Sequence, residues 1–171
     1  FPVEEDRWIA GLEWADSLGA DVVNSSLGYN LWDDGSGYNY QDLDGRTALS
    51  SIAARHGVER GLVIVVAAGN EALSSWHYIT APADADGVTS VGSVSLAIDP
   101  EDTPNISATS SRGPTSDGRI KPDLVAPGQG VVVADIRSGG YTRNNGTSFA
   151  APIVSGISAL MLQINPEWTP E

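Results

Sequence analysis

One stretch of the chain combines a candidate nucleophile with small neighbours: Gly146-Thr147-Ser148-Phe149-Ala150-Ala151-Pro152. The hydroxyl of Ser148 attacks a carbonyl carbon only if a base removes its proton and hydrogen-bond donors stabilise the oxyanion that forms. A serine at a helix start is also a favoured N-cap, which uses its hydroxyl only to satisfy a backbone N–H. The residue type leaves both roles open, so the rest of the chain must decide between them.

The base that such a serine needs is normally a histidine, and the sequence contains only His56 and His77. Both precede Ser148. Residues 146–150 imitate the Gly-x-Ser-x-Gly nucleophile elbow of α/β-hydrolases, but that fold places its histidine after the serine. The order of residues therefore argues against an α/β-hydrolase.

The elements predicted around Ser148 form a parallel sheet covered by helices. Apolar residues recur at helical spacing after Ser148, and helices are also predicted at residues 4–18 and from residue 47 to a stop at Gly57. Strands are predicted at 21–27, 61–70, 88–94 and 131–134, with a short extended piece at 121–128 and turn-rich segments between them. Alternation of helix and strand predicts an α/β fold with a mostly parallel sheet.

Composition excludes several classes of partner. The 22 acidic and nine basic residues give a net charge of −13, which argues against binding to nucleic acid or to an anionic membrane. We expect no apolar run of membrane-spanning length, and the absence of cysteine excludes disulfides and thiolate chemistry. The length of 171 residues predicts one domain.

Four ordered motifs stand out along the chain. One is the stretch around Ser148, and the other three are Ser26-Leu27-Gly28, Ala67-Ala68-Gly69-Asn70, and the pair Ser110-Ser111-Arg112-Gly113-Pro114 and Lys121-Pro122-Asp123-Leu124-Val125-Ala126-Pro127-Gly128. They resemble motifs of the subtilisin-like serine proteases, the subtilase family, in which the stretch around Ser148 corresponds to the nucleophile signature. Their order along the chain makes coincidence improbable.

This resemblance implies a three-layer, subtilisin-like α/β fold and a serine endopeptidase that forms an acyl-enzyme on Ser148. Asn70 then corresponds to the side-chain donor of the oxyanion hole. The implied partner is an extended peptide or protein, bound by two walls of a groove: Ser26, Leu27 and Gly28 on one side and Ala67, Ala68 and Gly69 on the other. The order of motifs favours the nucleophile role of Ser148 over the cap.

The family's triad aspartate and histidine have no counterpart in this sequence. His56-Gly57-Val58 is expected to end a helix rather than to open one, and His77 lies in a loop. We therefore expect residues 1–171 to be the nucleophile and oxyanion-hole part of a catalytic domain, truncated on its N-terminal side and inactive alone. Loss of upstream strands would leave the sheet open, which predicts a homodimer.

Three other functions compete with that of a subtilase. A sedolisin-type protease shares the Gly-Thr-Ser nucleophile but uses an acidic oxyanion residue, and Asn70 argues against it. A doubly wound nucleotide-binding domain would need a glycine-rich phosphate loop after a strand, which is absent. A pseudo-protease, or peptide-binding module that uses the same groove without cleavage, stays open as the alternative.

Metal binding and location are expectations from the resemblance. Subtilases often hold structural calcium, so the resemblance leaves calcium binding by the full-length protein open, and the acidic loop with Asp33, Asp34, Asp42 and Asp44 offers carboxylates. Acidic loops on so acidic a protein are usually solvated surface, and no metal or other cofactor is assigned. The family and the acidic charge predict a secreted or extracellular protein.

Overall fold

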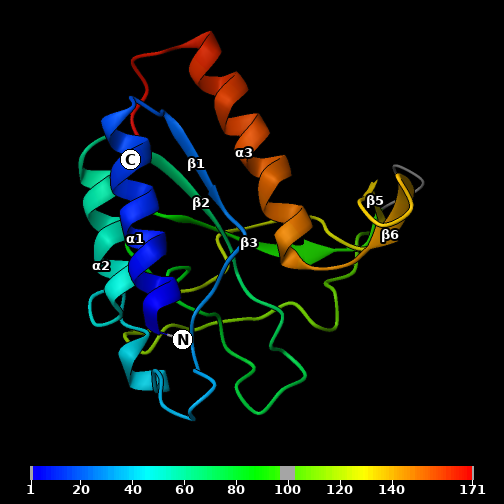
Figure 1. Ribbon diagram of the computed structural model, residues 1–171, viewed down its shortest axis with the longest axis horizontal. Helices are drawn as coiled ribbons and strands as arrows, with labels where there is room; N and C mark the ends of the chain where they lie inside the picture. Colours follow the sequence, from blue (N-terminus) through cyan, green and yellow to red (C-terminus); the bar gives the residue numbers. More distant parts are fainter. Residues whose placement is uncertain (1, 97–102, 171) are drawn as a thin grey trace.

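A four-stranded parallel sheet lies between two layers of helices (Figure 1). The computed structural model describes residues 2–96 and 103–170. Its helices are α1 (Pro2–Ser17), α2 (Leu49–Glu59) and α3 (Thr147–Ile164), with a 3₁₀ turn at Tyr40–Asp42. Its strands are β1 (Val22–Ser25), β2 (Val63–Ala67), β3 (Thr89–Val94), β4 (Leu124–Pro127), β5 (Val131–Asp135) and β6 (Gly140–Asn144). The prediction of an α/β fold with a parallel sheet is confirmed.

Strand β2 carries a hydrophobic core on each of its faces, as the continuous apolar run at 61–70 predicts. Ile64 and Val66 pack with α1 and α2, whereas Val65 and Ala67 pack with α3. All four side chains are at least 96% buried. Burial of each valine or isoleucine stabilises the fold by about 1.5–3 kcal/mol, so β2 anchors both helical layers.

The sheet has the order β1-β2-β3-β4, and every neighbouring pair is parallel. Because the strands are parallel, their carboxyl ends meet at one edge of the sheet. Functional groups of open parallel sheets gather at this edge. Ser26 follows β1, Gly69 and Asn70 follow β2, and α3 begins beside them.

The predicted end of the second helix at Gly57 is wrong. Helix α2 continues to Glu59, and Gly57 is buried inside it. A Cβ at position 57 would lie 2.7 Å from Cδ1 of Ile64, so this glycine lets α2 approach β2 closely. The apolar stripe of α1 is also narrower than expected, because Leu12 is buried but Trp14 and Leu18 are about two-thirds exposed.

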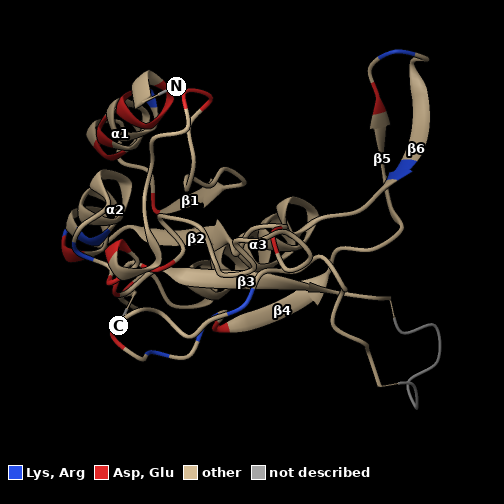
Figure 2. Ribbon diagram, turned by 90° about the horizontal axis from the view of Figure 1, so that it is seen from below, with Lys and Arg blue, Asp and Glu red and all other residues tan. Residues whose placement is uncertain are grey.

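The predicted strand at 131–134 exists but lies outside the parallel sheet. As β5, it pairs antiparallel with β6 in a separate hairpin that projects from the body of the molecule (Figure 2). Strand β6 was not predicted, because all five of its residues are exposed and carry no apolar alternation. The predicted turn-rich segment at 99–118 begins at residues 99–102, which lie outside the described residues.

Helix α3 packs one face on the sheet and leaves the other face exposed. Its exposed apolar side chains are Ile153, Ile157, Leu160, Met161 and Ile164. By length and composition alone, α3 is long and apolar enough to cross a membrane, and 22% of it is buried. The sequence was expected to contain no apolar run of membrane-spanning length. Contacts of α3 with β1, β2, β3 and β4 make it a sheet-covering helix in this fold.

Candidate active site

Ser148 lies inside the first turn of α3 and does not cap it. The N-cap is Gly146, whose φ of 146° is in the region that favours glycine. The Ser148 hydroxyl donates only to the backbone oxygen of Ser26, at a long distance of 3.4 Å. In return, the Ser26 hydroxyl donates to the backbone oxygen of Ser148 at 2.9 Å. The end of β1 and the start of α3 are thus held against each other.

The side-chain amide of Asn70 is oriented by the start of α3. Its Oδ1 accepts from the backbone N–H of Thr147 at 2.9 Å and from the Thr147 hydroxyl at 3.2 Å. The same hydroxyl accepts from the N–H of Gly69 at 3.2 Å. With Oδ1 of Asn70 held by Thr147, Nδ2 donates to no acceptor among the described residues. This NH₂ group, with its two N–H bonds, therefore remains available to a ligand as one donor.

A second donor lies at the N-terminus of α3. The first N–H groups of a helix have no acceptor within the helix, and the N–H of Ser148 is one of them. The positive end of the helix dipole adds to its attraction for an anion. Asn70, Thr147 and Ser148 line the same cavity. Two donors and a hydroxyl at one cavity can bind a carbonyl carbon and the oxyanion formed from it.

This cavity has a volume of about 120 Å³. It is lined by Ser26, Leu27, Gly28, Asn30, Ala67, Gly69, Asn70, Glu71, Thr80, Thr147 and Ser148. Seven of the eight residues singled out from the sequence therefore lie together. Ala68 does not line the cavity, because it is fully buried in the core with α1 and α2. Asn30, Glu71, Thr80 and Thr147 were missed.

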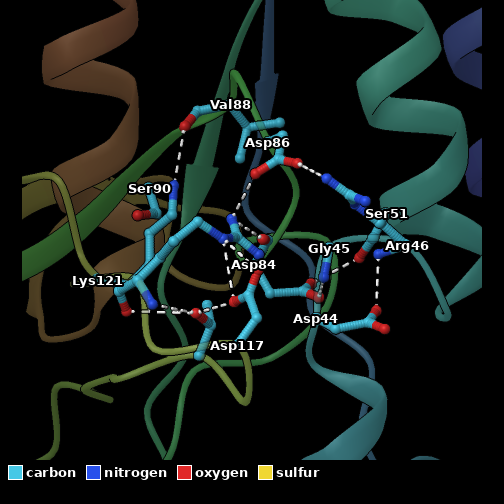
Figure 3. Close-up of polar contacts among 12 residues, drawn as sticks. Asp44, Gly45, Arg46, Ser51, Asp84, Asp86, Val88, Ser90, Asp117 and Lys121 are labelled. Carbon is cyan, nitrogen blue, oxygen red and sulfur yellow. Dashed lines mark hydrogen bonds and ion pairs between the residues drawn. The ribbon is translucent and has the colours of Figure 1, made fainter.

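A buried polar network holds the segment that follows Thr80 (Figure 3). The carboxylate of Asp84 accepts from the Ser51 hydroxyl of α2 at 2.6 Å and from the N–H of Gly45 at 2.8 Å. The backbone oxygen of Asp84 accepts from Nη1 of Arg119 at 2.7 Å. Burial raises the pKa of Asp84 above its ordinary value, although the hydrogen bonds oppose this. The network fixes the loop that follows Thr80 to α2.

Lys121 joins the starts of β3 and β4. Its ammonium group is almost fully buried and donates to the backbone oxygen of Val88 at 3.1 Å and to Oδ2 of Asp123 at 2.7 Å. The same carboxylate oxygen accepts from the N–H and the hydroxyl of Ser90. Burial alone would raise the pKa of Asp123, but the hydrogen bonds from Lys121 and Ser90 hold it below its ordinary value.

Neither histidine lies at the cavity. His56 is exposed in the last turn of α2 and contacts Glu59 through Nδ1 at 3.0 Å. His77 stacks on Tyr78 and has a φ of 44°, and it does not line the cavity. Glu71 is the one acidic or basic side chain among the described lining residues. The described residues thus place no histidine base beside Ser148.

The acidic loop uses its carboxylates for local hydrogen bonds. Asp34 accepts from Ser36, Asp42 accepts from the N–H of Asn39, and Asp44 accepts from residues 46 and 47. Asp33 lines a different surface cavity. Among residues 2–96 and 103–170, no three metal-ligating side chains lie together. Calcium binding by the full-length protein stays open.

Both the family comparison and the curated relatives indicate a subtilase. A family model described as "Subtilase family" matches residues 3–171. The chain is 32% identical over 184 residues to serine protease AprX of Bacillus subtilis (strain 168), covering 95% of this chain and 40% of that protein. It is 34% identical over 164 residues to subtilisin of Bacillus pumilus, covering 95% of this chain and 50% of the relative.

Solved structures agree with this. Sphericase superposes with a TM-score of 0.73 at 25% identity, covering 97% of this chain and 52% of that one. A cold adapted subtilisin-like serine proteinase superposes with a TM-score of 0.68 at 30% identity, covering 97% and 50%. The chain therefore spans about half the length of these proteins.

Proposed function

The chain belongs to the subtilase family, and from this premise we propose that it carries the nucleophile and the oxyanion hole of a serine endopeptidase. Ser148 is the proposed nucleophile, and Asn70 is the proposed side-chain donor. The single observation that carries the proposal is the orientation of the Asn70 amide. Thr147 holds its oxygen, so Nδ2 is left for the oxyanion at the cavity that Ser148 also lines.

In the proposed reaction, an extended peptide lies along Ser26, Leu27 and Gly28, with Ala67 and Gly69 on the opposite side. Oγ of Ser148 forms a bond to the carbonyl carbon while its proton passes to a base. Nδ2 of Asn70 and the N–H of Ser148 stabilise the oxygen that becomes negative. When the carbon–nitrogen bond breaks, the base returns the proton to the leaving amine, and water later releases the acyl group from Ser148.

The isolated 171-residue chain is proposed to be inactive, since no histidine lines the cavity among the described residues. We expect no turnover of a fluorogenic peptide and no labelling of Ser148 by a fluorophosphonate, with an intact subtilisin as positive control. Rapid stoichiometric labelling of Ser148, absent in Ser148→Ala, would reveal a base in this chain and contradict the proposal.

The same assay separates a protease from a peptide-binding pseudo-protease. In a longer form of the protein that supplies a histidine base, the peptide is expected to be hydrolysed, and Ser148→Ala is expected to lower the rate to that of the isolated chain. Tight binding of the peptide without hydrolysis in that longer form would favour the binding module instead. We also propose an extracellular location, on the family and the acidic charge.

We further propose that the isolated chain forms a homodimer through the free edge of β1. This strand pairs only with β2 in the described sheet, and the exposed apolar side chains of α3 lie on the face of the same sheet. Unpaired strand edges bind other edges through backbone hydrogen bonds. Light scattering is expected to give twice the monomer mass of 17.8 kDa. A monomer mass at high protein concentration would contradict the dimer.

A further inference from the structure

We propose that Asn145 is a site of spontaneous deamidation, in which its side-chain amide is converted to a carboxylate. The residue lies between β6 and α3, directly before the glycine that caps α3 (Figure 1). This inference goes beyond the proposed function, because the reaction needs only this chain and water. Its product alters the segment that leads into Ser148.

Asn145-Gly146 is the one Asn-Gly pair in the sequence. Glycine has no Cβ to obstruct its backbone nitrogen, so this nitrogen attacks a preceding asparagine more readily than that of any other residue. The nitrogen of Gly146 forms a bond to Cγ of Asn145 and loses its proton. The bond from Cγ to Nδ2 breaks, Nδ2 leaves as ammonia with that proton, and a five-membered cyclic imide remains.

Water then opens the imide at one of its two carbonyl carbons. Attack at Cγ gives aspartate. Attack at the backbone carbonyl carbon of residue 145 gives isoaspartate, in which the main chain runs through the former side chain and is longer by one CH₂ group. One water is consumed and one ammonia is released for each residue converted, so no oxidant or reductant takes part.

The structure leaves Asn145 accessible to this chemistry. The residue is exposed, and it belongs to neither β6 nor α3, so no regular hydrogen-bond ladder fixes its backbone. Nδ2, the group that leaves, donates to no acceptor among residues 2–96 and 103–170, and only Oδ1 of this side chain is bonded there. Ammonia therefore leaves without breaking a contact of its own with the fold.

Two hydrogen bonds restrain the attack. Oδ1 of Asn145 accepts from the backbone N–H of Gly130 at 2.7 Å, and the N–H of Gly146 donates to the backbone oxygen of Gly128 at 2.8 Å. Gly130 is held in turn, because its backbone oxygen accepts from Nη1 of Arg143 at 2.7 Å. Deamidation needs these contacts to open locally while the sheet and the helices stay folded. The fold thus slows the reaction without preventing it.

The isoaspartate product disturbs the proposed oxyanion hole. It lengthens the backbone directly before Gly146, the N-cap of α3. The next residue, Thr147, holds Oδ1 of Asn70 through its N–H and its hydroxyl. A shift of this segment weakens the start of α3, so the isoaspartate form is expected to melt about 2–8 °C lower than the unmodified chain.

The test compares the folded chain with a free peptide of residues 140–150 in mildly alkaline buffer. Mass spectrometry of proteolytic fragments measures conversion at each asparagine. Each restraining hydrogen bond slows the reaction by about 2- to 10-fold, so residue 145 of the folded chain is expected to react about 4- to 100-fold more slowly than in the peptide. It is also expected to react before any other asparagine of the chain. A rate more than about 1000-fold below that of the peptide, or earlier conversion of another asparagine, would contradict the inference.

Variants identify the restraint. Arg143→Ala releases Gly130 and is expected to raise the rate at residue 145 by about 2- to 10-fold. Arg137→Ala changes another exposed arginine of the same hairpin, so it is the matched control and is expected to leave the rate unchanged. Asn145→Ser removes the reactive amide, and its melting temperature is expected to stay constant during the incubation. Equal rates in Arg143→Ala and the unmodified chain would contradict the restraint assigned to Gly130.

Discussion

Asn70→Asp is expected to lower kcat by about 10²- to 10³-fold in a form of the protein in which a base reaches Ser148. This is the loss known for removing an oxyanion-hole amide from subtilisin. The aspartate keeps an oxygen that accepts from Thr147, but it has no N–H to offer the oxyanion. Its negative charge also repels the oxyanion. Initial rates with a fluorogenic peptide measure the effect.

Asn70→Ala separates this role from a structural one. Alanine removes the donor and also leaves the first N–H of α3, that of Thr147, without its acceptor. Loss of such a cap costs about 0.5–2 kcal/mol of stability. We therefore expect both variants to lose activity but only Asn70→Ala to melt clearly lower. The exposed Asn105→Asp is the matched control. An unchanged kcat in Asn70→Asp would show that another group serves the oxyanion.

Asp84→Ala is expected to destabilise the fold by about 2–6 kcal/mol at pH 7. The Ser51 hydroxyl and the N–H of Gly45 both lose their acceptor in a buried site, at a cost of about 1–3 kcal/mol each. Urea unfolding measures the change. The exposed Asp34→Ala, which removes only a turn contact, is the matched control and is expected to stay close to the unmodified chain.

The dependence of this effect on pH has a definite sign. Burial raises the pKa of Asp84 above its ordinary value of 3.8, so the folded state holds this proton more tightly than the unfolded state. The contribution of Asp84 is therefore most favourable below pH 3.8 and declines as pH rises through the raised value. Measured against Asp84→Asn, the unmodified chain should gain stability as pH is lowered toward 4. A difference that shrinks on acidification would contradict the shift.

Local patterns were sufficient to predict the elements that carry the reactive groups. The run at 61–70 has β-branched residues on both faces, so it predicts a buried strand, and β2 confirms it. Apolar spacing after Ser148 predicts α3 in the same way. Such elements are recognisable because the apolar pattern that marks each of them lies within one continuous segment of the sequence. Strand β6 shows the converse, since its exposed residues have no pattern to detect.

Motifs and apolar patterns in the sequence were enough to predict the family, the α/β class, and the placement of Ser148 at a helix start and of Asn70 after a strand. The contacts of the folded chain were needed to show that Gly146 caps α3, that the Asn70 oxygen turns toward Thr147, and that Thr80 lines the cavity. Each of these depends on contacts between segments far apart in the chain. Residue types and spacing specify which groups are present, whereas packing of the sheet edge sets the direction in which each group points.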